Sequence, residues 1–475
     1  MIDSKRDSKI IVGFQRQFPG INRSSLVVAN VSIIFYFLAL FPSRNHWDTA
    51  RILELARDDK SSDQWTAIYF RFLQALSFGG EFGMLPAIFG LICLVLAFLF
   101  FVTSFPFRGR TINVVAKAFL LSPFIGVFGM TLTHEVQSTT GTLILSGVLI
   151  RIARTNNTNL ANYKYHIVLS LILLSMIHTG IFIFLGFAVA YVLLVRRDLV
   201  FLIIAFCGLL LITLFGHQIL GVSEQSKALR YQSFLGDIKC VVQHPDASIN
   251  PADWNLLLLS GTREEWTSPS TCAYSQVYFA FPWVEKNQIT TMKLWLKLAS
   301  QNPQLAIEAR IQRAANALPP LLFTAPQAAI EVDYLKPVGL NAQDDLLIWS
   351  PLFKTSNDDE YQRLKFQNFK FMESLEAVAI LPAHLLNRNS SLWGWAGLWL
   401  SVAVLLMYLC GPFRLRKLGL IFLPQIFTCI SIVLFSPISD PRYSMNVTLT
   451  SLVICALLIP ELLKSIIRVK QPNAD

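Results

Sequence analysis

The sequence predicts an all-α polytopic membrane protein with about ten transmembrane helices and one long loop domain of mixed composition. Three observations lead to this prediction. Of the 475 residues, 53% are hydrophobic and only 15% are charged, and the mean hydropathy of +0.50 is too high for a soluble globular protein. Apolar runs of about 20 residues, which is the length that crosses a bilayer core about 30 Å thick, recur along the chain. Basic residues cluster between these runs.

Most of the apolar runs are each long enough for one span. The run at 165–195 is too long for one span and is interrupted by MIHTG, so we interpret it as a hairpin of two short helices. The first run follows a polar, basic segment and is long enough to span by itself, which predicts an anchor rather than a cleaved signal peptide. The single spans lie near residues 25–43, 84–104, 112–132, 139–153, 198–220, 391–411, 416–435 and 446–464.

The basic clusters set the predicted orientation, because Lys and Arg concentrate on the cytoplasmic side of a membrane protein. They mark both termini and every second loop only if 165–195 crosses the membrane twice. Both termini are then cytoplasmic, and the net charge of +10 needs no nucleic acid as a partner. The clusters contain Lys5, Arg6, Lys9, Arg16 and Arg23, then Arg108 and Arg110, Arg151, Arg154 and Lys164, Arg196 and Arg197, Arg414, Arg416 and Lys417, and Lys464, Arg468 and Lys470.

This topology divides the chain into three parts. Residues 1–220 form a transmembrane module, residues 221–390 an outer loop domain, and residues 391–475 the last transmembrane helices. Within the outer domain, NPQLAIEARIQRAANALP predicts a helix, because Asn-Pro starts it and a proline ends it. Cys240 and Cys272 share this domain, and the sequence leaves open whether they form a disulfide or remain thiols. No metal-ligand spacing such as CxxC occurs, so no metal site is predicted.

Three polar clusters fall at the outer ends of predicted spans. The first lies in the loop 44–83 and begins RNHWDTARILELARDD, the second is the predicted turn THEVQS, and the third is SDPRYSMNVT. The clusters are far apart in sequence, but the predicted topology places them on one side of the membrane at one depth. A shared depth is what a site at the membrane surface requires.

Asp48 is the principal candidate in the first cluster. Partial burial just beyond a span would raise the pKa of a carboxylate and make it a useful proton acceptor. As an alternative, Asp48 caps the helix that the spacing of Ile52, Leu53, Leu55 and Ala56 predicts along the membrane. The other charges of this stretch then form the solvated face of that helix.

The second and third clusters add groups of complementary type. His134 and Glu135 form a candidate orienting pair, although a turn whose charges point into water is the simpler interpretation. Arg442 can bind a phosphate through two parallel hydrogen bonds, or extend to lipid headgroups. Asp440 lies beside it, and Tyr443 and Trp47 are candidates either for substrate contact or for an aromatic belt at the interface.

The layout of these motifs resembles that of the GT-C superfamily of integral-membrane glycosyltransferases. The matching pieces are HWD at 46–48, HE at 134–135 and DPRYSMNVTL at 440–449, and SDQWTAIYFRFLQAL at 62–76 fits the amphipathic end of the first outer loop of that family. The long outer segment resembles that of an uncharacterised bacterial branch. The sequence departs from the commoner pattern at Thr49 and His134, where that family often has acidic residues.

The resemblance implies transfer of a sugar from a polyprenyl-phosphate carrier to a glycan, lipid or protein acceptor at the outer face of the bacterial inner membrane, with inversion. It implies Asp48 as base, Arg442 and Tyr443 at the donor phosphate, and His46, Trp47, His134, Glu135 and Asp440 as substrate-binding or orienting residues. Arg310 and Arg313 on the outer helix would extend a basic surface toward the donor or glycan. No cofactor is required, with a divalent cation as the alternative. A polymerase or ligase that uses diphosphate-linked glycan, and a transporter or flippase, are the rival functions.

Overall fold

We describe a computed structural model of the chain. The structure describes residues 18–40, 44–45, 52–53, 55–56, 60, 66–80, 83–107, 109–155, 160–195, 199–224, 227–270, 272, 277–319, 374–375, 378–379, 395–410, 419–436 and 441–469. His46, Trp47, Asp48 and Asp440 lie outside these residues, and the side chain of Arg442 also lies outside them.

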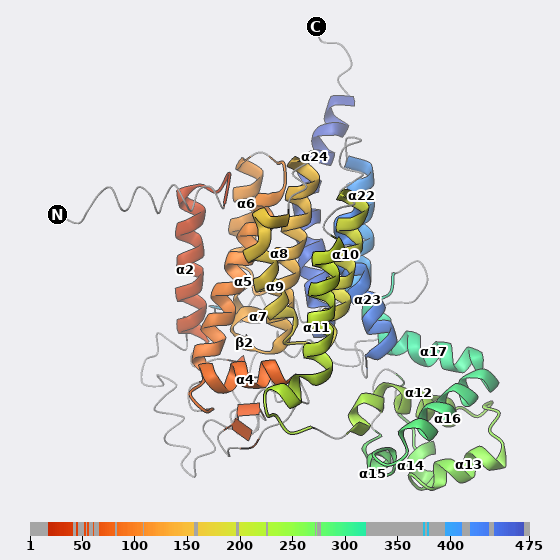
Figure 1. Cartoon of the computed structure of the whole chain (residues 1–475). Helices are drawn as coiled ribbons and strands as arrows, with labels where there is room; N and C mark the ends of the chain where they lie inside the picture. Colours follow the sequence, from red (N-terminus) through yellow and green to blue (C-terminus); the bar gives the residue numbers. More distant parts are fainter. Residues whose placement is uncertain are drawn as a thin grey trace.

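The main body is a bundle of helices that stand side by side, with α4 lying across its lower end (Figure 1). The longest helices extend from one end of the bundle to the other, and α9 and α10 form a helical hairpin. The elements are α2 (Arg23–Ala39), β1 (Arg44–Asn45), α4 (Ala67–Leu76), α5 (Met84–Ser104), α6 (Gly109–Leu120), α7 (Gly126–Met130), β2 (Thr131–Leu132), α8 (His134–Thr155), η1 (Leu160–Tyr163), α9 (Lys164–Leu174), α10 (Gly180–Val195), α11 (Leu199–Ile219), α22 (Ala396–Cys410), α23 (Leu423–Phe435), η8 (Pro441–Ser444) and α24 (Met445–Val469).

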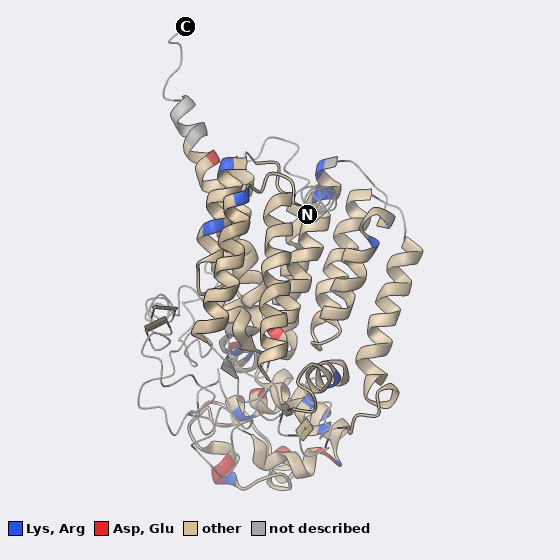
Figure 2. Ribbon diagram, turned by 90° about the vertical axis from the view of Figure 1, so that its left-hand side faces the viewer, with Lys and Arg blue, Asp and Glu red and all other residues tan. Residues whose placement is uncertain are grey.

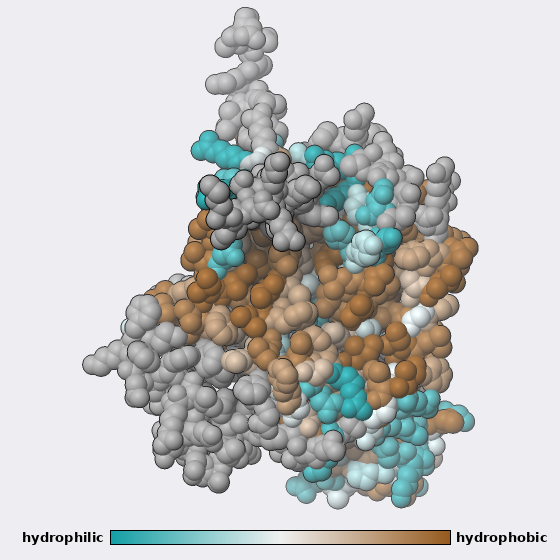
Figure 3. All heavy atoms as spheres, turned by 60° about the vertical axis from the view of Figure 1, so that its left-hand side comes forward, coloured by the Kyte–Doolittle hydropathy of each residue, from teal (hydrophilic) through white to brown (hydrophobic). Residues whose placement is uncertain are grey.

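The bundle has the surface of a membrane protein. Among the described residues, α5, α8, α11 and α24 are long and apolar enough to cross a bilayer, and six further apolar helices are shorter. Figure 3 shows a hydrophobic band across the helices with hydrophilic surfaces above and below it. On α11, side chains such as Val200, Ile204 and Leu214 are more than half exposed. Apolar surface of this kind is stable only against lipid or another protein, which confirms the predicted membrane character.

Two of the predicted spans can be compared directly with the helices of the structure. The run at 165–195 is divided into α9 and α10, with the break at residues 175–179, as the MIHTG sequence predicted. The predicted span 112–132 is wrong as one continuous helix, because the chain leaves α6 at Leu120 and resumes as the short α7. Pro123 explains the break, since proline lacks a backbone N–H and disfavours helical geometry in the residue before it.

The break also gives α2 a place to pack. Gly126 faces the ring of Tyr36, so that a Cβ added to this glycine would overlap the ring. The Tyr36 hydroxyl donates to the Leu121 carbonyl over 2.8 Å, and the Ser32 hydroxyl donates to the Leu120 carbonyl. These two carbonyls lie at the end of α6, where helix carbonyls lack partners of their own. The interrupted span is thus fixed by hydroxyls of α2.

The THEVQS segment is not a turn. Its residues from His134 onward form the first turns of α8, and only the β2 strand and Thr133 precede the helix. The Thr133 hydroxyl oxygen accepts a hydrogen bond from the Glu135 backbone N–H over 3.1 Å. Thr133 therefore satisfies one of the free N–H groups at the start of the helix, as capping residues do.

Residues 221–319 form a smaller helical domain at the lower end of the bundle (Figure 1). It has its own hydrophobic core, in which Trp266, Leu257, Val284 and Leu298 are almost completely buried. A disulfide joins Cys240 to Cys272, which decides the alternative that the sequence left open. The elements are η2 (Lys227–Tyr231), α12 (Gln232–Val242), α13 (Pro251–Leu258), α14 (Arg263–Thr267), η3 (Tyr278–Ala280), α15 (Phe281–Val284), α16 (Gln288–Gln301), α17 (Pro303–Ala314) and η4 (Ala315–Ala317).

The end of this domain is joined to the last helices of the bundle. The predicted NPQLAIEARIQRAANALP helix is present as α17, which continues into η4. A small apolar cluster includes Ala314 and Ala317 from this segment and Ile432 and Val447 from α23 and α24. The Trp395 indole N–H donates to the Leu318 carbonyl over 2.7 Å. This end of the domain is therefore packed against the bundle.

Candidate functional site at the lower end of the bundle

The three predicted clusters belong to elements that meet one end of the bundle. In Figure 1 the strand β2, the helix α4 and the smaller domain lie toward the lower end of the bundle, and β1 pairs with β2. Figure 2 shows Lys and Arg at both ends of the molecule, whereas most Asp and Glu lie toward the lower end. The lower end is therefore the part of the molecule where residues of both signs are available for chemistry.

A short parallel β-bridge connects the first cluster to the second. Arg44 of β1 pairs with Thr131 of β2, and Asn45 pairs with Leu132. Asp48 lies three residues after Asn45, and Glu135 lies three residues after Leu132. The two strands are parallel, and each candidate acid lies three residues beyond the bridge in the sequence.

Glu135 is a buried carboxylate at the start of α8. It is 1% exposed, so the interpretation of its charge as pointing into water is wrong for this residue. Its Oε1 lies 3.4 Å from Nε2 of His134. The start of a helix favours a negative charge through the helix dipole, which lowers the cost of burying this group. The pair is held within the protein, as an orienting group would need to be.

Tyr69 is a neighbour that the sequence did not single out. Its ring lies 5.5 Å from the His134 ring, edge to face, and its side chain is 1% exposed. Arg71, two residues further along α4, donates to the Leu220 carbonyl over 2.8 Å and to the Gly221 carbonyl over 2.9 Å. Arg71 thereby ties α4 to the end of α11, where the smaller domain begins. The spacing of aromatic residues in AIYFRFLQAL was the available signal, but it reads equally as ordinary core packing.

A seam of neutral polar side chains fixes α24 against α8. The Asn446 amide donates to the Thr142 hydroxyl over 3.2 Å and to the Thr428 hydroxyl over 3.1 Å. The Gln425 amide and the Ser146 hydroxyl are 2.9 Å apart. Hydrogen bonds between helices hold a bundle together in lipid, where hydrophobic burial contributes little. Sequence reasoning missed this seam, although the many hydroxyl residues within two predicted spans were its signal.

The seam also sets the level of the third cluster. Thr142 lies about two turns from the start of α8, and its partner Asn446 lies in the first turn of α24. The η8 segment with Arg442 and Tyr443 directly precedes α24, so it stands toward the same end as His134 and Glu135. Tyr443 is half-buried and packs against the apolar cluster that contains Ala314 and Ala317. Tyr443 therefore packs at the junction between the smaller domain and the bundle.

Arg310 and Arg313 share one buried carboxylate. Asp237 is 2% exposed and forms ion pairs with Arg310 and, over 2.9 Å, with Nη2 of Arg313. The Trp295 indole N–H donates to the same carboxylate over 3.0 Å. Arg313 is 1% exposed, so the predicted basic surface does not include it. Its guanidinium instead pairs with Asp237 inside the domain.

Two further observations concern the buried guanidinium of Arg313. A Cβ added to Gly236 would overlap Nη1 of Arg313, so the glycine makes room for the guanidinium. Burial lowers the pKa of Arg313 to about 10, while the neighbouring Asp237 opposes this shift. Arg313 thus remains charged at neutral pH. Arg310 is partly exposed and donates to the Leu434 carbonyl of α23 over 3.1 Å, which connects the network to the bundle.

Comparison with known proteins identifies no relative. No family model matches the chain, and no curated protein or solved structure matches it significantly. Within the described part of the chain, no group of three or more His, Cys, Asp or Glu side chains is placed to hold a metal ion. The assignment of a function therefore depends on the arrangement of the residues themselves.

The β-bridge can be tested by a designed disulfide. Cysteines at positions 45 and 132 should cross-link within one chain under mild oxidation, because neighbouring strands lie about 4.8 Å apart and a disulfide spans Cα atoms about 4.4–6.8 Å apart. The cross-link is detected by peptide mapping with mass spectrometry. Cysteines at positions 45 and 139 form the control pair, since position 139 lies in the second turn of α8 and is not paired with β1. Equal yields for both pairs would show that the bridge is absent in the membrane.

Proposed function

We propose that the protein is a glycosyltransferase of GT-C type that moves a sugar from a polyprenyl-phosphate donor to an acceptor hydroxyl at the outer membrane face. The observation that supports this most is the β-bridge, because it joins the loop of Asp48 to the segment of His134 and Glu135. The polar seam adds the third cluster at the same end. A carboxylate, an orienting pair and a phosphate-binding arginine are the groups that the reaction needs.

The proposed reaction is a single displacement with inversion. The acceptor oxygen forms a bond to the anomeric carbon while the bond from that carbon to the phosphate oxygen breaks. Asp48 accepts the proton of the acceptor hydroxyl, and the polyprenyl phosphate leaves with the electron pair. Arg442 stabilises the negative charge on the departing phosphate through paired hydrogen bonds, which a lysine could not form in the same geometry.

His134 and Glu135 serve this reaction as orienting groups. Glu135 is buried and its oxygen lies near the imidazole of His134, so the pair can fix one orientation of the ring. The ring of Tyr69 packs edge to face against the same imidazole and restricts it further. A histidine held in this way can position the acceptor hydroxyl or the loop that carries Asp48.

The proposed orientation places the lower end of the bundle outside the cytoplasm. The basic clusters that separate the predicted spans favour a cytoplasmic upper end. The Cys240–Cys272 disulfide lies in the domain at the lower end, and disulfides persist chiefly in oxidising compartments. Both arguments favour a site on the side of the membrane away from the cytoplasm, and the bacterial inner membrane is what the resemblance implies.

The rival functions differ in the donor or in the absence of chemistry. A polymerase or ligase would consume a glycan attached through a diphosphate. A transporter would carry ionisable groups near the middle of its spans, whereas the seam between α8, α23 and α24 consists of neutral amides and hydroxyls. This difference in charge is why the enzyme is preferred to the transporter.

One experiment separates these functions. The purified protein in lipid nanodiscs is incubated with a panel of polyprenyl-phosphate and polyprenyl-diphosphate sugars and an acceptor extract, and loss of each donor is followed by mass spectrometry. The proposal expects consumption of at least one monophosphate-linked sugar. Consumption of diphosphate-linked glycan alone would establish the polymerase or ligase. Transbilayer movement of an intact donor without consumption would establish the transporter.

A further inference from the structure

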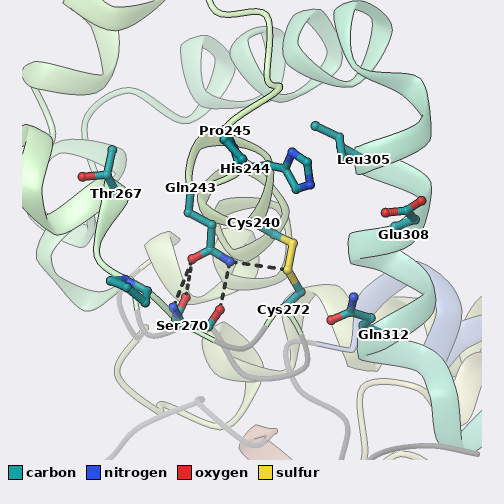
Figure 4. A pocket seen from close by; sticks show the side chains of 11 residues that line it. Cys240, Gln243, His244, Pro245, Thr267, Ser270, Cys272, Leu305, Glu308 and Gln312 are labelled. Carbon is teal, nitrogen blue, oxygen red and sulfur yellow. Dashed lines mark hydrogen bonds between the residues drawn. A yellow bond between two sulfur atoms is a disulfide. The ribbon is translucent and has the colours of Figure 1, made fainter.

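An open pocket lies beside the disulfide of the smaller domain, and none of the described residues that line it belongs to the three polar clusters. Its volume is about 310 Å³. One wall is the end of α12 with the Cys240–Cys272 disulfide, and the opposite wall is one face of α17 (Figure 4). Leu305, Glu308 and Gln312 recur on α17 at helical spacing and line the pocket on the side across from the disulfide. The pocket is thus formed by two helices of one domain together with residues 267, 269, 270 and 272 of the same domain.

The wall next to the disulfide is held by several bonds. The Gln243 amide donates to the Ser270 carbonyl over 2.9 Å and accepts from the Ser270 N–H over 3.1 Å. It also accepts from the Ser270 hydroxyl over 3.0 Å. Together with the disulfide, these bonds fix residues 270 and 272 against α12. Because this wall is already ordered, binding of a ligand costs less conformational entropy than it would at a flexible wall.

The lining combines hydrogen-bonding and apolar groups without a cation. The imidazole of His244, the carboxylate of Glu308 and the amide of Gln312 can donate or accept hydrogen bonds. Neither Lys nor Arg is among the described residues that line the pocket, so these residues offer a phosphate no permanently charged partner. Apolar contact comes from Leu305, from the disulfide and from two proline rings, Pro245 and Pro269.

We propose that this pocket binds a neutral oligosaccharide, namely a part of the acceptor remote from the hydroxyl that reacts. A sugar ring presents hydroxyl groups at its edge and C–H groups on its faces, which match the two kinds of lining. The lack of a cation disfavours the phosphate-linked donor. The inference rests on the proposed function for the identity of the ligand, but the binding itself needs no catalysis.

The position of the pocket agrees with an acceptor site. Gln312 and Arg310 lie within one turn of α17, and Arg310 reaches the Leu434 carbonyl of α23. The apolar cluster at the end of α17 contains Tyr443 as well. A glycan held in the pocket is therefore held by a helix that is fixed to the bundle, close to the segment that carries Arg442.

Binding is tested on the full-length protein in nanodiscs by saturation-transfer NMR. The probes are neutral tetrasaccharides derived from dextran, mannan and chitin, together with glucose 1-phosphate. We expect at least one tetrasaccharide to bind more tightly than glucose 1-phosphate, and the double variant Glu308→Ala/Gln312→Ala to weaken that binding about tenfold through two lost hydrogen-bonding groups. The control is Glu264→Ala/Gln301→Ala, which removes the same residue types from exposed positions elsewhere in the domain.

Two outcomes would overturn the inference: no neutral tetrasaccharide binds the wild-type protein, or the double variant binds as the control does. Tighter binding of glucose 1-phosphate than of every tetrasaccharide would overturn it as well. The Asp48→Asn variant should bind the oligosaccharide normally, because the role proposed for Asp48 is proton transfer and not binding of this part of the acceptor. Oligosaccharide binding without sugar transfer would therefore refute the proposed function alone, and normal transfer with no pocket binding would refute this inference alone.

Discussion

Replacing Asp48 with Asn is expected to reduce sugar transfer from a polyprenyl-phosphate donor by about 10²–10⁴-fold, the contribution of a positioned general base. Asparagine keeps the shape of the side chain but cannot accept the proton of the acceptor hydroxyl. The loss should appear in kcat while donor binding remains, because the proposed phosphate contact is made by Arg442. The measurement is single-turnover transfer by purified protein in nanodiscs with a labelled donor.

The matched control for this experiment is Asp58→Asn in the same stretch. Asp58 is predicted to lie on the solvated face of the helix that follows Asp48, so its loss should leave transfer within about twofold of wild type, as is usual for exposed surface positions. Transfer by Asp48→Asn at the level of the control would refute the base. An equal, large loss in both variants would show that the stretch acts through its structure instead.

The fold could be predicted where hydropathy alone decides it. Residues 84–104 are apolar except for Thr103 and Ser104 at the end, and α5 has the same bounds. The prediction that MIHTG divides 165–195 into two short helices was correct. It was made because the basic clusters mark every second loop only if this run crosses the membrane twice. The span at 112–132 was wrong because an apolar average does not register one proline. Pro123 changes the path of the chain without lowering its hydropathy.

The parts of the site that could not be predicted depend on contacts between distant segments. Nothing in the residues Arg44 and Asn45 indicates that they pair with Thr131 and Leu132, since a two-residue bridge has no periodicity of its own. The hydroxyl residues of two predicted spans indicated polar contacts between helices, but they could not show that Asn446 contacts Thr142 and Thr428. Charge placed the clusters at the ends of spans, and pairing between segments brings two of them together.

Arg313 shows the same limit in the opposite direction. A basic residue in an amphipathic helix is usually exposed, and on that expectation it was predicted to extend a surface. Its burial depends on Asp237 and on the space left by Gly236, which lies far away in sequence. A sequence pattern on one helix cannot report the carboxylate and the glycine of another.

Asp237 accordingly has the largest expected effect on stability. Replacing it with Asn leaves Arg313 buried without its counter-charge and removes the acceptor shared by Arg310 and Trp295. Removing one partner of a buried ion pair costs about 3–5 kcal/mol. We expect the smaller domain of the Asp237→Asn variant to unfold at a clearly lower temperature. The measurement is thermal unfolding followed by tryptophan fluorescence, together with limited proteolysis between residues 221 and 319.

Asp253→Asn provides the matched control, because Asp253 is also 1% exposed and pairs with Lys297 over 2.6 Å. The Lys297 side chain is 46% exposed, so its ammonium can turn toward water when the partner is lost. Arg313 has no such path, and Asp237→Asn should therefore destabilise the domain more. Adding Arg313→Met to Asp237→Asn should recover part of the loss, since the buried charge is then removed as well. Equal destabilisation by the two single variants, without recovery in the double variant, would mean that the cost arises from lost hydrogen bonds and not from a stranded charge.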